Sequence, residues 1–521
     1  MAEFAHNLLT EPVLTVATNG ASAVRRTLPE VLSDLANGVN FEFAALQPHQ
    51  FHAWHAFLVQ LGALAAFHAG VHNVKDLSQA SQWATALRAL TDDRDEPWCL
   101  IVSDLKTAAF MQPPIPEGST AKWNRDNLAG TPDTLDLLAT AKNHDVKMER
   151  IAKPHTEHWV YALVSLQTMQ GFSGRENYGI ARMNGGLSNR PAFAAAGDLA
   201  WPTRFVRDAN LLFESRSAIA EAHSFDAETG RALLWLIPWN GDDQLRIDEL
   251  DPFFIEICRR VRLFLSDGEI VGRWSTTKAT RIAAKELKGN LGDPWVPIRV
   301  ADGAALTATG LDYELVQRVL FDGEFRASAA GSPQPIDGNE PMLICQVLVR
   351  GQGKTEGYHE RFIPIPPKAR LRLATERGRR QIGELSKQRL EAIKEVTRRV
   401  LRPALAALLQ GGPDQLDLRD ERIEPFVEFY DREIDSVYFH ELFEDLDLNT
   451  EESRIRWLNR LLDFALGALE KAKLSASVPS ARVYRAHAAA GRRFFGAARR
   501  LRLAAGEKFE LPGEIDESPS T

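Results

Sequence analysis

A glycine-rich segment between two apolar runs, Leu343 to Pro366, constrains most strongly how this chain can fold. Its centre, RGQGKTEG, contains the Gly-Lys-Thr of a phosphate-binding loop, but such a loop also needs a glycine where Leu348 stands here. It must also open a helix, which the prolines of IPIPP at residues 363–367 exclude. The segment therefore predicts strand, turn and strand. An ordinary solvated turn is one interpretation of its tip, which holds out Gln352, Lys354, Thr355 and Glu356 on flexible glycines.

Length and charge narrow the class of protein. At 521 residues the chain is long enough for about two to four domains, each with its own core. Its 44% hydrophobic and 25% charged residues are typical of soluble globular proteins, and it contains no secretion signal and no apolar run of the roughly 18 residues that cross a bilayer. We therefore expect a cytoplasmic protein with no membrane partner. A net charge of −8 argues against non-specific coating of nucleic acid but allows a local basic site.

No pattern in the chain indicates a reaction or a cofactor. The histidines of HQFHAWH, at positions 49, 52 and 55, diverge around a helix, and those of HTEH lack the zinc-protease frame. There is no Gly-x-Ser-x-Gly and no informative carboxylate pair, so we expect no catalytic residue, no cofactor and no metal. The cysteines lie far apart among apolar neighbours, which predicts buried free thiols at Cys99, Cys258 and Cys345.

The fold class expected is α+β, with a large mixed α/β domain over residues 1–367, because helices, strands and long loops alternate there without a clean βαβ repeat. Thr27 is placed to cap a helix, and helical spacing is strongest from Gln47 to Ala69. A further helix is predicted over Leu250 to Leu265, bearing Arg259, Arg260 and Arg262. Other predicted helices span 29–36, 78–90, 157–169 and 313–321, and strands span 7–16, 97–104 and 232–239.

Beyond Pro367 the composition changes to that of a helical bundle. Residues 368–510 contain about four long helices with breaks rich in glycine, proline or serine, and residues 511–521 are predicted to be a disordered tail. The first helices have an excess of basic residues and the segment 414–452 an excess of acidic ones. The arginines of the first and last helices therefore either pair with acidic neighbours, face solvent, or form a phosphate-binding face.

Several polar loops of the first domain have the residues of a binding surface. The longest begins GFSGRENYG at Gly171, and its glycines allow close approach to the backbone. Lys142 to Lys147, the segment around Lys278 and the tip of the glycine hairpin are similar in character. Such loops can contact phosphates through lysine and arginine and a groove through small polar groups. A long surface loop without a ligand is the alternative interpretation.

Long strings in the chain resemble CasA, the large subunit of the type I-E Cascade complex of CRISPR immunity. The resemblance covers most of the chain. The similar strings are NLL and PVL near the start, PHQFHAWHAFLVQLGALA from Pro48, FMQPP from Phe110, KNHD from Lys142, GFSGRENYGIARMNGG from Gly171, GDPW from Gly292, and the hairpin RGQGKTEGYHER.

The resemblance implies a non-enzymatic subunit that recognises the protospacer-adjacent motif of double-stranded target DNA from the minor groove. It also implies a wedge that separates the strands to start R-loop formation, a bundle that holds the displaced strand, and recruitment of a helicase-nuclease. Its partners would be DNA and the CRISPR RNA ribonucleoprotein with the other Cascade subunits. The residues implied for the motif are Gly171, Phe172, Ser173, Gly174, Arg175 and Lys278.

The same resemblance assigns the remaining site residues. The wedge hairpin would consist of Gln352, Gly353, Lys354, Thr355 and Glu356. The loop near the guide's 5′ handle would contain Lys142, Asn143, His144 and Lys147. The zinc-binding cysteine cluster of some members is missing here, which again predicts no metal.

Two other functions remain open at the level of sequence. One is a nucleotide hydrolase that uses Gly353-Lys354-Thr355, which requires binding of ATP or GTP by the chain. The other is a helical-bundle scaffold with no nucleic-acid contact of its own.

Overall fold

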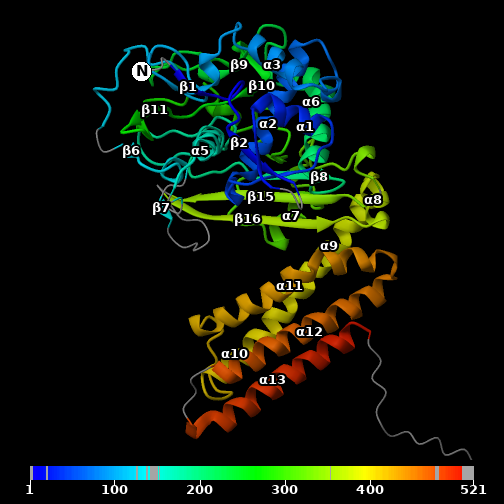
Figure 1. Ribbon diagram of the computed structural model, residues 1–521. Coiled ribbons are helices and arrows are strands. Elements are labelled where there is room, and N and C mark those ends of the chain that lie inside the picture. The colour runs from blue at the N-terminus through cyan, green and yellow to red at the C-terminus, as the bar shows by residue number, and fades with distance from the viewer. Residues whose placement is uncertain are drawn as a thin grey trace, which may run out of the picture. The chain divides into compact units, whose positions relative to one another are not determined.

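The computed structural model describes residues 4–18, 22–124, 127–136, 139–140, 151, 153–338, 340–351, 354–475 and 480–506. The chain forms two compact units (Figure 1). Unit 1 comprises Met1–Leu311 and Arg318–Ile365, and unit 2 comprises Asp312–Gln317 and Pro366–Thr521. Helix and sheet are mixed in the first unit and the second is helical, which confirms the predicted α+β fold class.

Unit 1 combines helices with several small sheets. Its helices are α1 (Leu28–Ala36), α2 (Phe51–His68), α3 (Ala80–Ala89), α4 (Asp133–Asp136), α5 (Thr156–Met169) and α6 (Trp201–His223). Its strands are β1 (Phe4–Asn7), β2 (Leu14–Ala17), β3 (Val24–Arg26), β4 (Glu42–Phe43), β5 (Cys99–Val102), β6 (Leu128–Ala129), β7 (Ala139–Thr140), β8 (Ala192–Ala196), β9 (Arg231–Leu233), β10 (Leu250–Ile255), β11 (Arg260–Ser266), β12 (Glu269–Ser275), β13 (Ile298–Arg299), β14 (Phe325–Arg326), β15 (Met342–Gly351) and β16 (Lys354–Pro364).

Local sequence signals determine where the first helix begins. The Thr27 hydroxyl accepts a hydrogen bond from the backbone N–H of Glu30 at 3.3 Å, and the Glu30 carboxylate accepts one from the N–H of Thr27 at 2.7 Å. This reciprocal capping box satisfies two N–H groups that the helix itself cannot pair. The predicted cap at Thr27 is confirmed.

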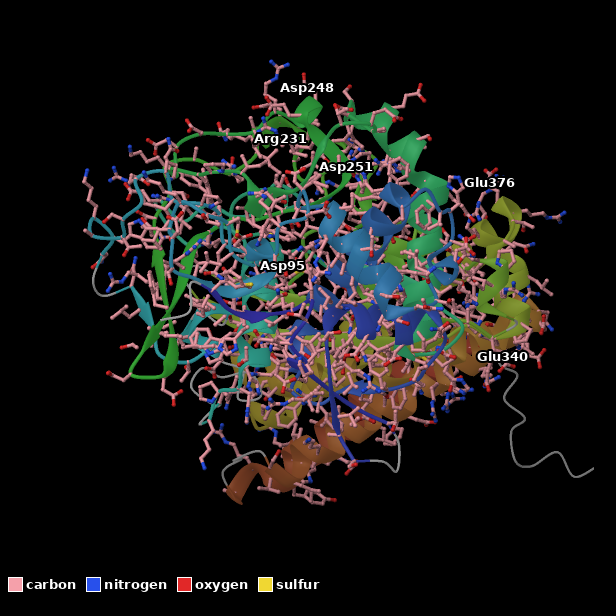
Figure 2. All side chains as sticks on the ribbon, turned by 45° about the horizontal axis from the view of Figure 1, so that its top comes forward. Asp95, Arg231, Asp248, Asp251, Glu340 and Glu376 are labelled. Atoms are coloured by element: carbon pink, nitrogen blue, oxygen red, sulfur yellow. The ribbon has the colours of Figure 1, made fainter. Side chains whose placement is uncertain are left out.

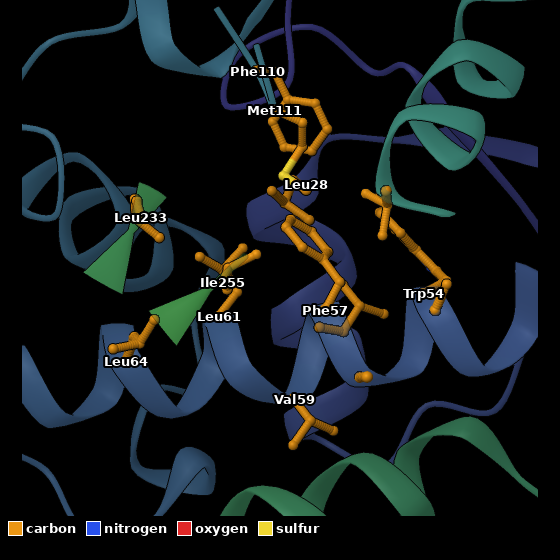
Figure 3. Packing of buried hydrophobic residues seen from close by; sticks show 14 of the residues in the cluster. Leu28, Trp54, Phe57, Val59, Leu61, Leu64, Phe110, Met111, Leu233 and Ile255 are labelled. Atoms are coloured by element: carbon orange, nitrogen blue, oxygen red, sulfur yellow. The ribbon is translucent and has the colours of Figure 1, made fainter. Parts of the chain in front are cut away.

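Helix α2 lies in the centre of the unit 1 core. Every residue from His52 to Ala66 is buried, so the helix is enclosed on all sides, as a helix without a polar face must be. It packs against α3, α5, α6 and β10. In Figure 3, Trp54 and Phe57 of this helix lie among apolar side chains from distant segments, including Phe110 and Ile255.

The predicted helix from Leu250 to Leu265 is wrong. This segment forms β10 and then β11, which pairs antiparallel with β12. Its hairpin turn is Asp267-Gly268, whose φ angles of 52° and 86° are both positive, and Asp-Gly is the residue pair that favours such a turn.

Other predicted elements differ in extent. The strand expected over 232–239 ends at Leu233, where a short 3-10 turn follows. The strand expected over 7–16 is divided into β1 and β2 by a turn, since Pro12 interrupts it. Helix α6, which is 23 residues long, was not predicted. Arg207 and Arg216 of this helix are buried in ion pairs, so its sequence has no simple amphipathic stripe.

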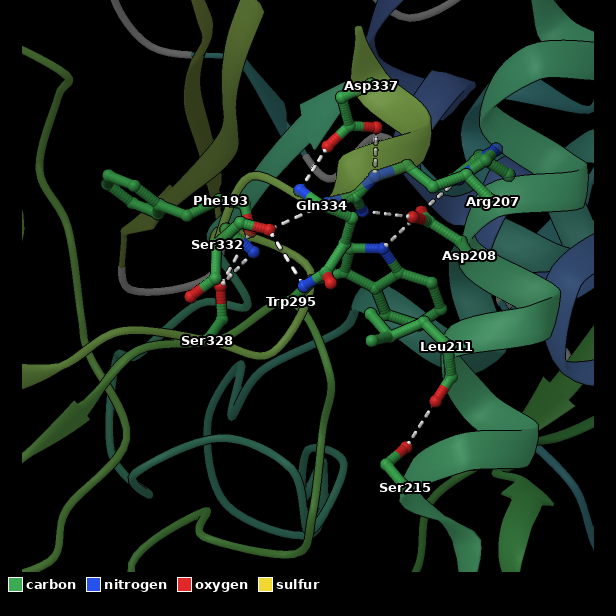
Figure 4. Close-up of polar contacts among 12 residues, drawn as sticks. Phe193, Arg207, Asp208, Leu211, Ser215, Trp295, Ser328, Ser332, Gln334 and Asp337 are labelled. Atoms are coloured by element: carbon green, nitrogen blue, oxygen red, sulfur yellow. Dashed lines mark hydrogen bonds and ion pairs between the residues drawn. The ribbon is translucent and has the colours of Figure 1, made fainter. Parts of the chain in front are cut away.

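A buried polar network joins α6 to the loops beside it (Figure 4). Arg207 donates to Asp337 at 2.7 Å and to Asp208 at 2.8 Å, and the indole N–H of Trp295 donates to Asp208 at 3.0 Å. The imidazole of His55 also bonds to Asp208, at 2.8 Å. Burial by itself raises the pKa of the Asp208 carboxyl, but these hydrogen bonds and charges bring it below its ordinary value.

A second buried ion pair ties the same helix to β10. Arg216 donates to the two carboxylate oxygens of Asp251 at 3.0 and 2.7 Å. Asp248, three residues earlier, is instead half exposed and pairs with the exposed Arg246 (Figure 2).

A four-stranded sheet contains the hairpin that dominates the sequence. Its strand order is β7-β16-β15-β8, so β15 is a central strand. Residues 343–350 of β15 and all of β8 are buried, and β15 pairs antiparallel with β16 from Met342↔Pro364 to Gly351↔Lys354. The predicted strand, turn and strand are confirmed for the two arms, whereas Gln352 and Gly353 lie outside the described residues.

Unit 2 consists of α8 (Pro367–Leu373), α9 (Glu376–Val396), α10 (Arg402–Leu409), α11 (Glu424–Glu444), α12 (Thr450–Ser475) and α13 (Val483–Ala504). A π-helical turn, Thr397–Leu401, joins α9 to α10. Helix α12 packs against α9, α11 and α13, and α10 packs against α13. The start of α7 (Tyr313–Leu320) also belongs here, since the Tyr313 N–H donates to Asp435 at 2.7 Å.

Buried and surface ion pairs cross the helices of unit 2. Arg389 of α9 donates to the buried carboxylate of Asp445, which also receives the hydroxyl of Ser453 at 3.1 Å. On the surface, Arg402 pairs with Glu424 at 2.8 Å, and Arg485 pairs with Asp414. Part of the arginine excess is thus paired with acidic neighbours, as one interpretation of the sequence held.

Candidate nucleic-acid interface

The loop from Gly171 to Gly179, here called the glycine loop, follows directly after α5. It is closed by its own backbone: the N–H of Ser173 donates to the Asn177 carbonyl, and the N–H of Asn177 donates to the Gly174 carbonyl, both at 3.0 Å. At its base the N–H of Ile180 donates to the Gln170 carbonyl at 3.0 Å. The loop is therefore a compact turn with a defined conformation.

Glycine is required at both ends of this loop. A Cβ added to Gly171 would lie 2.5 Å from the carbonyl oxygen of Ser188, and one added to Gly179 would lie 2.5 Å from the carbonyl carbon of Gly171. Gly174 has open space around it, but its φ of +120° is disfavoured for residues with a side chain. The two ends of the loop cross so closely that only glycine fits.

Arg259 fills the interior of the glycine loop. Its guanidinium donates to the carbonyl of Gly171 at 3.1 Å, to the hydroxyl of Ser173 at 3.3 Å, to the carbonyl of Asn177 at 3.5 Å, and to the carbonyl of Tyr178. The side chain is buried. A single planar group thus binds both ends of the loop.

Gln167 of α5 holds Arg259 in place. Its amide oxygen accepts the backbone N–H groups of Cys258 and Arg259, both at 2.9 Å, and its amide nitrogen donates to the Arg259 carbonyl at 3.0 Å. The same nitrogen donates to the Met111 carbonyl at 2.8 Å. All of these atoms are buried, so the position of Arg259 is set by the core.

Lys278 lies on a segment that is bonded to the glycine loop. The N–H of Thr277 donates to the carbonyl of Glu176 at 2.8 Å. The side chain of Lys278 is 77% exposed, and its ammonium group lies 2.9 Å from the carboxylate of Asp242, whose hydrogen bond raises the pKa of Lys278. Arg175 is 93% exposed beside Glu176. The structure therefore brings together the motif-binding residues predicted from the sequence: Gly171, Phe172, Ser173, Gly174, Arg175 and Lys278.

The wedge hairpin is only partly described, and Thr355 lies elsewhere than expected. Its hydroxyl is buried and accepts a hydrogen bond from Arg350, so it does not extend from the tip. A register shift opposite Arg350 inserts Glu356 as a bulge, which turns Thr355 inward. Glu356 is partly exposed, and Lys354 is described only by its backbone in β16.

The end of β15 next to the hairpin tip is close to the glycine loop. Arg350 is buried and donates to the Asp136 carbonyl at 2.8 Å. Burial and the charge of Arg259 lower the pKa of Arg350 and the nearby Asp136 raises it, with a net result of about 10. Two guanidinium groups therefore lie in one buried region beneath the loop and the hairpin.

The predicted guide-handle residues Lys142, Asn143, His144 and Lys147 lie outside the described residues. The strand before them, β7, pairs in parallel with the beginning of β16, with Thr140 opposite Thr355. Strand β7, which precedes these residues in the sequence, thus lies beside the turn end of the hairpin.

The geometry does not fit a nucleotide-binding loop at residues 353–355. Lys354 begins a β-strand, whereas a phosphate-binding loop opens a helix whose N–H groups face the phosphates. The hydroxyl of Thr355, which would bind the metal of the nucleotide, is instead bonded to Arg350 in the interior.

The described histidines and cysteines show no metal site. His49 bonds to Asp136 and His55 to Asp208, both at 2.8 Å, while burial lowers the pKa of His52 well below its ordinary value. Among the described residues no group of three or more possible ligands gathers. The predicted free, buried thiols are confirmed at Cys99, Cys258 and Cys345. No described helix is both long and apolar enough to span a membrane.

Arg259, Gln167, Arg350 and Asp242 were not predicted as parts of this site. A usable signal for Arg259 was the Asp-Gly pair at 267–268, which indicates a hairpin and places the preceding RVRLFLS in a strand. The other three residues have no local signal, because their roles depend on contacts with distant segments.

The fold is similar to solved CasA structures over nearly the whole chain. A structure of Thermus thermophilus CasA (Cse1) has a TM-score of 0.60 at 16% identity, covering 95% of this chain and 99% of that chain. Thermobifida fusca Cse1 has a TM-score of 0.61 at 12% identity, covering 96% and 98%. The CRISPR-associated protein Cse1 from Acidimicrobium ferrooxidans has a TM-score of 0.57 at 12% identity, covering 97% and 99%.

No protein-family model and no curated protein matches the sequence. The likeness to the solved structures nevertheless extends through both compact units, and it agrees with the strings of residues that resemble CasA. This chain therefore has the fold of the CasA (Cse1) proteins.

Proposed function

We propose that this chain is the large subunit of a type I-E Cascade surveillance complex and recognises the protospacer-adjacent motif in double-stranded DNA. The observation that carries this proposal is the meeting of the glycine loop with Lys278 in a chain of the CasA fold. These segments are about a hundred residues apart in sequence, and one backbone hydrogen bond, from Thr277 to Glu176, joins them.

The chemistry of this surface suits the minor groove of DNA. Lys278 and Arg175 are exposed cations that can contact phosphates. The glycine loop offers backbone and a small hydroxyl at close range, which a narrow groove admits more easily than long side chains. Contacts of this kind distinguish A·T from G·C pairs but not A·T from T·A, so several related motifs would be accepted.

We further propose that the hairpin tip, at Gln352, Gly353, Lys354 and Glu356, separates the DNA strands beside the motif, while Thr355 points inward to Arg350. Support comes from the rigid anchoring of its arms, because β15 is a buried central strand paired on both sides. Unstacking one base step costs on the order of a few kcal/mol, which a wedge must offset by its own contacts. Opening the duplex there would start the R-loop.

The remaining roles follow from the same assignment. Lys142, Asn143, His144 and Lys147 would contact the guide RNA handle and the other Cascade subunits. The exposed arginines of α13, Arg492, Arg493, Arg499 and Arg500, would help to hold the displaced strand. The assembled complex would then recruit a helicase-nuclease, and the chain itself would act in the cytoplasm without enzymatic activity, cofactor or metal.

The test uses the reconstituted complex and a motif-bearing duplex. The double variant Gln352→Ala, Lys354→Ala is expected to assemble normally but to bind this duplex more weakly than the wild type. The matched control is Lys75→Ala with Gln82→Ala, an exposed lysine and glutamine elsewhere in unit 1. Duplex binding equal to that of the control would remove the wedge assignment, and equal binding of duplexes with and without any motif would remove the proposed function.

A further inference from the structure

Several buried arginines of unit 1 form ion pairs, whereas the hydrogen bonds of buried Arg259 go almost entirely to one loop. Arg190, Arg207 and Arg216 each pair with a buried aspartate. Arg259 has no ion pair among the described residues, and apart from the carbonyl of its neighbour Cys258 its hydrogen-bond acceptors all belong to the glycine loop. A buried cation kept without a carboxylate is costly, so its place in the fold calls for a role.

We propose that Arg259 is the positioning residue of the glycine loop, and that it turns the backbone N–H groups of Phe172, Tyr178 and Gly179 outward toward DNA. This inference rests on the proposed function, since it assigns the donors that would read the motif.

The direction of these N–H groups follows from peptide geometry. The carbonyls of Gly171, Asn177 and Tyr178 point inward at the guanidinium. The structure has no cis peptide bond among the described residues, and in a planar trans peptide the C=O and the following N–H point in opposite directions. The N–H groups of residues 172, 178 and 179 therefore point away from Arg259.

These three donors are available for a ligand. Their residues are partly exposed, and no backbone hydrogen bond from them occurs within the described part of the chain. By contrast, the N–H groups of Ser173, Asn177 and Ile180 are used to close the loop. Acceptors are what the floor of the minor groove presents, as purine N3 and pyrimidine O2 atoms.

A guanidinium suits this task better than an ammonium group. It presents five N–H donors in one plane, and here they reach acceptors at both ends of the loop. Gln167 binds both the N–H and the carbonyl of the Arg259 backbone, so the planar guanidinium, whose donors form a fork, is held at a fixed place. Lysine at this position would keep the charge but not the simultaneous contacts.

The experiment separates positioning from charge and from general stability. Arg259→Met removes both the charge and the fork, and Arg259→Lys removes only the fork. The matched control is Arg262→Met, because Arg262 is equally buried in the same segment and also donates to carbonyls, but to those of Val102 and Asp104 at 3.1 and 3.0 Å. Each variant is assembled into the complex, and its affinity is measured for duplexes with and without the motif.

We expect both Arg259 variants to lose the preference for the motif by about tenfold or more, while Arg262→Met keeps it. In parallel, hydrogen exchange of the glycine-loop amides is expected to become faster in the Arg259 variants than in Arg262→Met. Arg259→Lys guards against a failure of Arg259→Met to fold, since it preserves the charge and most of the volume.

A wild-type preference for the motif in Arg259→Met would overturn the inference. A wild-type preference in Arg259→Lys together with its loss in Arg259→Met would also overturn it, because the effect would then come from the charge. If the wild-type complex shows no preference for the motif, the proposed function itself is wrong. In that event the exchange rates of the loop amides would still decide whether Arg259 positions the loop.

Discussion

The ammonium group of Lys278 lies 2.9 Å from the carboxylate of Asp242, on the segment that is hydrogen-bonded to the glycine loop. The hydrogen bond raises the pKa of Lys278, which therefore remains charged at neutral pH. Both side chains are well exposed, and a pair of this kind contributes little free energy in water. A DNA phosphate can therefore compete with Asp242 for the lysine.

Neutralising Asp242 should strengthen DNA binding. In Asp242→Asn, Lys278 no longer has to leave a carboxylate, so we expect duplex affinity at low salt to rise about threefold or more. If the freed lysine adds one phosphate contact, the slope of log affinity against log salt steepens by about 0.9. Asp248→Asn, which removes another exposed, arginine-paired carboxylate, serves as control and should change neither quantity. Unchanged affinity in Asp242→Asn would place Lys278 outside the DNA contact.

Alanine at either end of the glycine loop should weaken binding of the motif-bearing duplex. Gly171→Ala and Gly179→Ala each place a methyl group about 2.5 Å from backbone, so the loop must open. Gly174→Ala meets no atom but has an unfavourable φ, which costs on the order of 1 kcal/mol. We expect motif-duplex affinity to fall most in the first two variants. The control is Gly467→Ala on the exposed side of α12, which should stabilise unit 2 by up to about 1 kcal/mol.

Removing the hydroxyl of Thr355 should destabilise the end of the hairpin next to its tip. Thr355→Val keeps the shape but deletes the acceptor for one guanidinium nitrogen of the buried Arg350, while the other nitrogen keeps its bond to the Asp136 carbonyl. A loss of about 1 to 3 kcal/mol in the free energy of unfolding is expected, measured by urea denaturation. Thr85→Val, which removes an exposed helix hydroxyl, should stay within about 0.5 kcal/mol of the wild type. Equal effects of the two substitutions would contradict the importance of this contact.

Glu256 should make stability depend on pH. Burial raises the pKa of its carboxyl from the ordinary 4.5 to about 7, against the lowering effect of Arg182 and the Ala181 N–H. The unfolded chain loses this proton near pH 4.5, whereas the folded chain keeps it to about pH 7. Folding therefore binds a proton in this window, and stability falls as the pH rises through it.

The variant Glu256→Gln keeps a side-chain oxygen that can accept the hydrogen bond from the Ala181 N–H, and it cannot ionise. Relative to the wild type, its free energy of unfolding should increase by up to about 3 kcal/mol between pH 4.5 and pH 8. Glu221→Gln, at an exposed position of α6, should follow the wild-type pH profile. Parallel profiles for wild type and Glu256→Gln would show that the buried carboxyl does not change its proton affinity on folding.

Elements with strong local signals were predicted correctly. The cap at Thr27, the helix around Trp54 and the two arms of the hairpin depend on capping residues, helical periodicity and prolines within a few positions. The helix predicted over Leu250 to Leu265 failed because an amphipathic helix would expose its charged residues, whereas Asp251, Glu256 and the three arginines of this segment are all buried. The decisive signal was the turn at Asp267-Gly268.

The candidate site likewise has features that short stretches of sequence predict and features that depend on contacts between distant segments. Sequence alone determined the glycine loop, the lysine segment and the hairpin as unusual polar strings, because glycine content, charge and resemblance are properties of short stretches. Only the tertiary structure decided that Arg259, 81 residues after Tyr178, fills the loop, and that Thr355 turns inward to Arg350. The physical reason is that a buried donor takes whichever acceptors folding brings to it, and those acceptors come from segments distant in the sequence.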